Sequence, residues 1–351
     1  MLFLERLSAA IEQVDSSSGA IGSCVNGAIR ELVPIIAAAP ADAKTRGAWM
    51  ERLFDAYLED NIPYIEALGD EFGALCGSKV VASGWADRLL PIARNALSPN
   101  AGPGRYSKVT AVCLSALFTA DRFDELIELV RADALWGNRK WAVRAMAAKG
   151  GVDDAIRFAE ASRGPYSSDG HIDAVCEELL IANGRADEAY ARYGIRANQR
   201  GTYLATFRAV AKKYPDKPER DILMDLARST PGEEGKWFAA AKDAGLFEEA
   251  LGFASRSPCD PKTLTRAACD FAETRPAFAV GAGLLAMHWL VQGYGYEITG
   301  LDVWAAYHAT LAAAAKYGNV QEVKERVRQT IAAGTAGAQF VAKILGRELD
   351  A

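Results

Sequence analysis

The sequence predicts an all-α protein, a solenoid of degenerate helical hairpins stacked as an α-α superhelix. Three observations predict this fold. A short turn signature recurs along the chain, apolar residues follow an i, i+3, i+4, i+7 spacing nearly everywhere, and no segment shows the sustained alternation of a half-buried strand. Such spacing gathers apolar residues on one face of each helix, and stacked hairpins bury those faces against one another.

The turn signature joins a helix stop to a helix start. Its clearest copy is GLFEEA at residues 245–250, where Gly245 takes the left-handed conformation that ends a helix and two glutamates favour the positive end of the next. Looser copies lie at residues 120–126, 150–155, 183–189 and 317–323. Ala155 and Ala189 are 34 residues apart, the period of the tetratricopeptide repeat, whereas the other intervals are irregular. We therefore expect a degenerate array of tetratricopeptide-like hairpins.

Helices are expected wherever the apolar spacing runs between breaks rich in Gly, Pro, Ser and Asp. Phe123, Leu126 and Val130 show this spacing, and Asp260 followed by Pro261 is a helix cap followed by proline at the first helical position. The expected helices span residues 2–14, 20–37, 42–58, 62–75, 79–97, 105–119, 122–132, 137–148, 152–162, 170–182, 186–193, 199–213, 218–229, 234–243, 247–256, 261–274, 276–291, 300–316, 319–333 and 336–348.

One apolar run stands out, at residues 277–291, with His288 as its only polar side chain. It is shorter than the about 20 residues that a bilayer-spanning helix needs, so it predicts a helix buried on all sides. Gly281 and Gly283 would let a neighbouring helix approach closely.

Turn formers also suggest the domain organisation. The loop at residues 98–104 is the richest in Pro and Gly, and it predicts a boundary between an N-terminal helical part, residues 1–98, and a helical-repeat array, residues 105–351, continuous with it. The next longest break, residues 164–170, is expected to be an extended loop within the array.

Charge and cysteine content exclude several classes of protein. The net charge of -5 exerts no overall attraction on nucleic acid or an anionic membrane. Residues 1–15 lack the basic region and long apolar run of a signal peptide, so we expect a cytoplasmic protein without a membrane partner. The six cysteines are scattered and never form a C-x-x-C pair, which argues against a metal knuckle or a redox motif.

Three segments carry a family resemblance. They are residues 230–238 (TPGEEGKWF), 257–264 (SPCDPKTL) and 293–300 (GYGYEITG). In these segments the chain resembles a proteobacterial helical-repeat family known as a domain of unknown function, which is also found at the C-terminus of some bacterial SWIM zinc-finger proteins. The resemblance implies a cytoplasmic bacterial helical-repeat protein and no catalytic residues. The chain has no Cys-x-Cys followed by Cys-x-His, so the zinc finger itself is absent.

The loop at residues 293–300 is the first candidate site. It brings Tyr294, Tyr296 and Glu297 beside a helix that carries Trp304 and His308, and such a loop could present aromatic and acidic groups to a protein or peptide. The structural alternative is a tight connection in which Thr299 caps the next helix.

A basic and aromatic stretch at residues 185–213 is the second candidate site. Positive side chains interleaved with aromatic rings suit single-stranded nucleic acid, whereas the alternative is a solvated face of ordinary helices. The residues that would bind nucleic acid are Arg192, Arg196, Arg200, Arg208 and Lys212.

Enzyme chemistry has little support in the sequence. The three histidines belong to no H-E-x-x-H motif, there is no G-x-S-x-G motif, and no metal ligand set or cofactor motif is present. The leading hypothesis is a non-catalytic scaffold or adaptor that binds a protein or peptide on the concave face of the solenoid. The alternatives are a nucleic-acid-binding helical repeat and a hydrolase or glycosylase whose site is assembled between distant helices.

Overall fold

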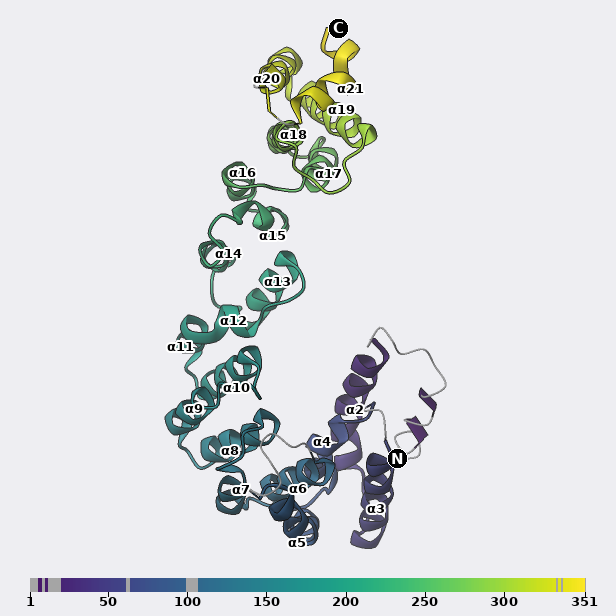
Figure 1. Cartoon of the computed structure of the whole chain (residues 1–351), viewed down its shortest axis with the longest axis vertical. Helices are drawn as coiled ribbons and strands as arrows, with labels where there is room; N and C mark the ends of the chain where they lie inside the picture. The colour runs from purple at the N-terminus through teal and green to yellow at the C-terminus, as the bar shows by residue number, and fades with distance from the viewer. Residues whose placement is uncertain are drawn as a thin grey trace. The chain divides into compact units, whose positions relative to one another are not determined.

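A computed structural model describes residues 6–7, 10–11, 20–60, 64–98, 107–332, 334–335 and 337–350. All regular structure in these ranges is helical, which confirms the predicted all-α class. The chain divides into two compact units, Met1–Ala197 (unit 1) and Asn198–Ala351 (unit 2). Within each unit, the helices pack mainly against helices one or two places away in the chain, as in an α-solenoid (Figure 1).

Unit 1 contains two rows of helices. The first-helix row is α4, α6, α8 and α10, the second-helix row is α5, α7, α9 and α11, and α2 packs on α4 (Figure 1). The helices are α2 (Ala20–Ala38), α3 (Ala43–Glu59), α4 (Ala67–Leu75), α5 (Lys79–Ala96), α6 (Lys108–Thr119), α7 (Phe123–Val130), α8 (Trp136–Ala148), α9 (Val152–Glu160), α10 (Asp169–Ala182), α11 (Ala186–Ala189), the π-helix η2 (Tyr190–Gly194) and α12 (Ile195–Ala197).

Unit 2 continues the hairpin pattern. Its helices are α13 (Tyr203–Lys213), α14 (Glu219–Arg228), the 3₁₀-helix η3 (Glu234–Trp237), α15 (Phe238–Asp243), α16 (Phe247–Arg256), α17 (Pro261–Phe271), α18 (Pro276–Val291), α19 (Gly300–Tyr317), α20 (Val320–Ala332) and α21 (Ala338–Asp350). Phe247, Phe271 and Phe278 stack edge to face in its core, with ring centroids 4.8–5.4 Å apart.

The five copies of the turn signature are all left-handed turns. The backbone angle φ is 57° at Asp121, 90° at Gly150, 73° at Gly184, 72° at Gly245 and 87° at Gly318. In the first copy an aspartate takes the conformation that glycine takes in the others, which is consistent with the tolerance of Asp for this region. The predicted helix stops are therefore confirmed, and they repeat along the chain because each one is decided locally.

Most differences from the predicted helices are small and have local causes. The helix expected at 62–75 begins at Ala67, because the backbone bends at Tyr64 and Ile65, where the Ile65 N–H is held by the Asp60 carboxylate at 3.1 Å. The helix expected at 186–193 continues through η2 into α12. The helix expected at 2–14 lies largely outside the described residues.

The predicted domain boundary also falls mostly outside the described residues, since residues 99–106 are not among them. The helices on either side of this loop, α5 and α6, pack on one another within unit 1. The division that the structure shows lies after Ala197. A boundary at residues 98–104 stays a prediction.

Helix α2 ends on a buried arginine. Arg46 of α3 is 6% exposed, and its guanidinium donates hydrogen bonds to the carbonyls of Ile36 at 2.7 Å and Ala39 at 2.6 Å. These carbonyls lie in and just after the last turn of α2, so the positive charge complements the negative end of the helix. Among the described residues, α2 is also the one helix that is long and apolar enough to cross a membrane, judged by length and composition alone.

Helix α18 differs from its prediction. One face is fully buried, and Gly283 lies so close to α19 that a Cβ there would be 2.3 Å from Thr310 Oγ1. The opposite face, which includes Gly281, Leu284 and His288, is only half-buried. The prediction of a helix buried on all sides is therefore wrong for this face, because no helix of the described chain covers it completely.

Candidate functional site

A groove of about 880 Å³ opens on the first-helix row of unit 1. It is bounded by α2, α4, α6, α8 and α10 and by the loop that precedes α10. Its charged and aromatic lining residues are Arg30, Glu66, Asp70, Trp136, Lys140, Arg144, Tyr166, His171 and Glu178.

Helical spacing brings these side chains to one face. On α8, Trp136, Lys140 and Arg144 are four residues apart, so they lie one above another along the helix. His171 and Glu178 are separated by two turns of α10 and also face the groove. Neighbouring helices of the row thus each contribute one polar stripe to the same hollow.

The loop before α10 is held against α8. The backbone N–H of Trp136 donates to the carbonyl of Tyr166 at 3.3 Å, and the N–H of Gly164 donates to Ser167 Oγ at 2.8 Å. These bonds position Tyr166, which is 44% exposed, at the edge of the groove. The loop therefore has a defined structure and offers an aromatic side chain to a partner.

The groove presents charges of both signs. Lys140 forms an ion pair with Asp70 across the space between α8 and α4. Arg144 lies over the ring of Trp141, 5.4 Å from its centroid, and forms no ion pair with any other described residue. Glu66 and Glu178 are exposed and likewise have no ionic partner in the described ranges. These side chains are available to charged and hydrogen-bonding groups of a partner.

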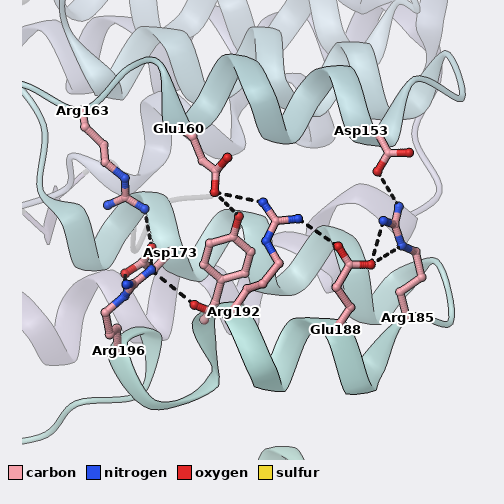
Figure 2. Close-up of polar contacts among 9 residues, drawn as sticks. Asp153, Glu160, Arg163, Asp173, Arg185, Glu188, Arg192 and Arg196 are labelled. Carbon is pink, nitrogen blue, oxygen red and sulfur yellow. Dashed lines mark hydrogen bonds and ion pairs between the residues drawn. The ribbon is translucent and has the colours of Figure 1, made fainter. Parts of the chain in front are cut away.

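The arginines of the second-helix row are held differently, as Figure 2 shows. Arg185 pairs with Asp153 of α9 at 2.7 Å and with Glu188 at 2.7 Å. Arg192 pairs with Glu160 of α9 at 3.0 Å and with Glu188 at 2.8 Å. Each arginine thus joins a carboxylate of its own hairpin to one of the preceding hairpin.

A buried carboxylate anchors the end of this arginine network. Asp173 of α10 is 1% exposed and accepts hydrogen bonds from Arg163 and from Arg196, the latter at 3.0 Å (Figure 2). Because two guanidinium groups surround one buried charge, its desolvation is offset by charge-assisted hydrogen bonds. We call the charged residues joined by these ion pairs the arginine network: Asp153, Glu160, Arg163, Asp173, Arg185, Glu188, Arg192 and Arg196.

The π-helix η2 places a tyrosine inside the network. Tyr193 is 1% exposed, and its hydroxyl donates to Glu160 Oε1 at 2.6 Å. This bond, with the guanidinium of Arg192, holds the pKa of Glu160 below its ordinary value. The tyrosine ring is buried and has no free face on which a base could stack.

The predicted nucleic-acid site is divided between the two units. Arg192 and Arg196 lie in unit 1 and are paired with carboxylates, whereas Arg200, Arg208 and Lys212 lie in unit 2. Arg208 is itself paired with Asp243 at 2.6 Å, and Arg200 donates to the carbonyl of Gln199 at 2.9 Å. The charges of Arg192, Arg196 and Arg208 are therefore neutralised by carboxylates, whereas Arg200 and Lys212 are exposed and form no ion pair with a described residue.

The predicted partner loop has a mixed character. Tyr296 is 81% exposed, while Tyr294 packs edge-on against Trp289 with ring centroids 6.0 Å apart. Glu297 has a φ of 48°, and its carbonyl accepts from Lys262 at 3.3 Å. Thr299 is the N-cap of α19, as expected, and it forms a capping box with Asp302, whose carboxylate accepts from the Thr299 N–H at 2.8 Å.

The next helix contributes an aromatic pair. Trp304 is 43% exposed and lies 4.0 Å from the ring of His308, centroid to centroid. The Nε2 atom of His308 is buried and has no hydrogen-bond partner in the described ranges. The structure therefore brings together Trp304 and His308, and it places Tyr294 against a different tryptophan.

The groove residues of α8 and α10 were not among the predicted site residues. The break at residues 164–170 was recognised as an extended loop, and the four-residue spacing of Trp136, Lys140 and Arg144 is visible in the sequence. The sequence does not show that α8 and this loop lie side by side, because helix α9 separates them in the chain.

Among the described residues there is no metal site, and four of the six cysteines are buried. In the part of the chain that the structure describes, no group of three His, Cys, Asp or Glu side chains is placed to hold a metal ion. Cys76, Cys113, Cys176 and Cys259 are buried, and burial raises the pKa of Cys176 to about 11. Such thiols are protonated at neutral pH and act as small core residues.

The fold and the groove define a class of protein, the α-helical repeat proteins. Comparison of the chain with protein-family models, with curated proteins and with solved structures found no match. The resemblance to the proteobacterial helical-repeat family stays a prediction from the three sequence segments that suggest it.

Proposed function

We propose that the chain is a non-catalytic scaffold or adaptor that binds a segment of a partner protein in the groove of unit 1. The observation that carries this proposal is the groove itself, a hollow of about 880 Å³ on the first-helix row that is lined by unpaired charges of both signs and by aromatic side chains. Stacked helical hairpins commonly use such a face to bind a peptide or a protein.

The lining favours a peptide over an apolar metabolite. Small-molecule pockets are mostly apolar with a few polar groups, whereas this groove is bounded by polar stripes from successive helices. Arg144 suits a carboxylate, Glu178 suits a basic side chain, and Tyr166 offers a ring to pack on a partner side chain. The proposed ligand is therefore an extended segment of mixed charge.

The proposal also includes the type of repeat and the family of the chain. The left-handed Gly and Asp turns support tetratricopeptide-like hairpins, and the segments at residues 230–238, 257–264 and 293–300 support a bacterial, cytoplasmic helical-repeat family.

Site-specific photo-crosslinking in cells tests the groove directly. We expect p-benzoylphenylalanine in place of Tyr166 to give a discrete protein adduct, which mass spectrometry identifies. Arg144→Glu should weaken that adduct about tenfold, because charge reversal opposes a carboxylate of the partner. The same photoreactive residue in place of Val80, which is 83% exposed on α5, is the matched control outside the groove.

Two outcomes would overturn the proposal: no adduct from position 166, or the same adducts from positions 166 and 80. The double variant Tyr294→Ala/Tyr296→Ala tests the predicted loop in the same assay. An unchanged adduct from position 166 would show that the loop is not needed for this partner.

A further inference from the structure

The half-buried face of α18 lines a second groove, which lies wholly in unit 2. Its volume is about 930 Å³, and it runs along α18 between α16 and α20. Its floor is formed by Ala277, Val280, Gly281, Leu284, Leu285 and His288. This i, i+3, i+4, i+7, i+8, i+11 spacing is one continuous stripe of a helix, about 16 Å long at 1.5 Å per residue.

The two walls of this groove differ in character. The α16 wall carries no charge and consists of Leu251, Gly252 and Ser255. The Leu251 side chain lies over Gly281, where a Cβ would be 2.8 Å from its methyl carbon. The α20 wall is polar and carries Glu322 and Arg326. An occupant would therefore meet an apolar floor, a small wall and a charged wall.

The charges of the α20 wall are not satisfied by their neighbours. Glu322 and Arg326 are one turn apart and exposed, yet neither forms an ion pair with another described residue. On the same helix Arg328 does pair with Glu325, at 3.6 Å. The wall thus presents one acidic and one basic group, four residues apart, to whatever occupies the groove.

The geometry points to a partner's amphipathic α-helix as the occupant. A mostly apolar helical stripe bordered by two other helices is a surface on which a further helix packs, ridges into grooves, with its axis about 8–10 Å away. The bound helix places a leucine-rich face on α18, small residues against Gly252 and Ser255, and a Lys/Glu pair against Glu322 and Arg326. The bound helix would cover the half-buried face of α18.

Fluorescence anisotropy with the full chain tests this site. The probe is a fluorescein-labelled peptide of about 15 residues with leucines at i, i+3, i+4, i+7, i+8 and i+11, alanines on one flank, and Glu and Lys four residues apart on the other. We expect a Kd of about 10 µM. A peptide of the same composition with its leucines spread around the helix should bind at least tenfold more weakly, because it lacks one apolar face.

Variants of the chain locate the binding. Ser255→Trp fills the groove from α16 and should abolish binding, whereas Arg256→Trp, the adjacent exposed position outside the groove, should not. The double variant Arg326→Glu/Glu322→Lys should bind the original peptide about fivefold more weakly than the wild type does. It should bind a peptide with Glu and Lys exchanged about fivefold more tightly than it binds the original peptide. The exchange separates recognition from a general loss of folding.

The proposal is overturned if the patterned peptide does not bind at 100 µM, a concentration about ten times the expected Kd. It is also overturned if both peptides bind equally, or if Ser255→Trp has no effect. If the full chain dimerises and Ser255→Trp abolishes the dimer, the occupant of the groove is a second copy of the chain and not a partner's helix. Loss of groove crosslinking in unit 1 would leave this result unaffected, because the two grooves share no residue.

Discussion

Arg192 and Arg144 lie in the same compact unit, but they are held in opposite ways. Arg192, beside α11, is fixed between Glu160 and Glu188, whereas Arg144 of α8 rests on Trp141 and has no ionic partner among the described residues. The comparison teaches that the number of basic residues in a stretch does not give the charge available to a ligand. The carboxylate one hairpin away decides it.

The spacing of the ion pairs follows the repeat. Asp153 and Arg185 are 32 residues apart, as are Glu160 and Arg192, and the pair Arg208–Asp243 in unit 2 spans 35. A separation of one hairpin places the two side chains on adjacent helices of the same row. We infer that pairs at this spacing have a structural role, whereas Arg144, Glu66 and Glu178 at the groove form no ion pair with a described residue.

The largest expected effect comes from breaking the buried end of the arginine network. Asp173→Ala leaves Arg163 and Arg196 without their shared carboxylate and should lower the free energy of unfolding by about 3 kcal/mol. Urea titration followed by circular dichroism measures this change. Asp153→Ala, at a carboxylate that is 73% exposed, is the matched control and should change little. Equal losses in both variants would contradict the buried anchor.

A smaller effect is expected from pH. Because the folded protein lowers the pKa of Glu160 from 4.5, the stability that this group contributes is present above that pH and is lost as the pH falls through the folded value. Glu160→Gln should cost on the order of 1 kcal/mol at neutral pH, allowing for its partial exposure, and should reduce the loss of stability in acid.

Glu178, a carboxylate of the groove, provides the control for Glu160→Gln. Glu178→Gln removes an exposed glutamate that has no ionic partner among the described residues, and we expect it to leave the free energy of unfolding at neutral pH as in the wild type. Urea midpoints measured between pH 7 and about pH 3 distinguish the two variants. If Glu160→Gln and the wild type lose stability equally in acid, the hydrogen bonds of Glu160 to Tyr193 and Arg192 do not contribute to the pH dependence of stability.

Groove variants should affect stability still less. Arg144→Glu and Tyr166→Ser alter partly exposed side chains, so each should change the free energy of unfolding by no more than about 0.5 kcal/mol. The same urea titrations measure this change, while crosslinking at position 166 reports binding. A large destabilisation by Arg144→Glu would show that the groove, like the arginine network, serves the fold.

The smallest expected effect is on single-stranded nucleic acid. Because Arg185, Arg192, Arg196 and Arg208 are paired with carboxylates, the wild type should bind a labelled oligonucleotide no more tightly than about 100 µM at physiological salt, measured by anisotropy. Asp153→Asn, Glu160→Gln and Glu188→Gln together should release Arg185 and Arg192 and produce salt-sensitive binding. Tight, salt-sensitive binding by the wild type would instead support the nucleic-acid alternative.

Much of the fold could be predicted from the sequence because it depends on local interactions. The left-handed stop at Gly245, the Asp260 cap and the first-turn acids at α16 act within a few residues of one another, and the structure confirms each of them. The short π-helix η2 was not predicted, since the contact that accompanies it, Tyr193 with Glu160, joins residues 33 positions apart.

The candidate site could be predicted only in part. The sequence predicts the extended loop at residues 164–170, which carries Tyr166 to the edge of the groove. The groove that combines Tyr166 with α8 was not predicted, because hairpin spacing alone does not say which face of each helix remains uncovered.

The sequence by itself determined that this chain forms helical hairpins, and where most of them turn, since capping, glycine conformation and apolar spacing act over a single turn or helix. Only the tertiary structure decided which arginines are neutralised, which side of α18 stays open and which polar stripes meet in a groove. The physical reason is distance along the chain: these outcomes depend on side chains about one hairpin or more apart, and the energy of a charge or an apolar face is set by what packs beside it.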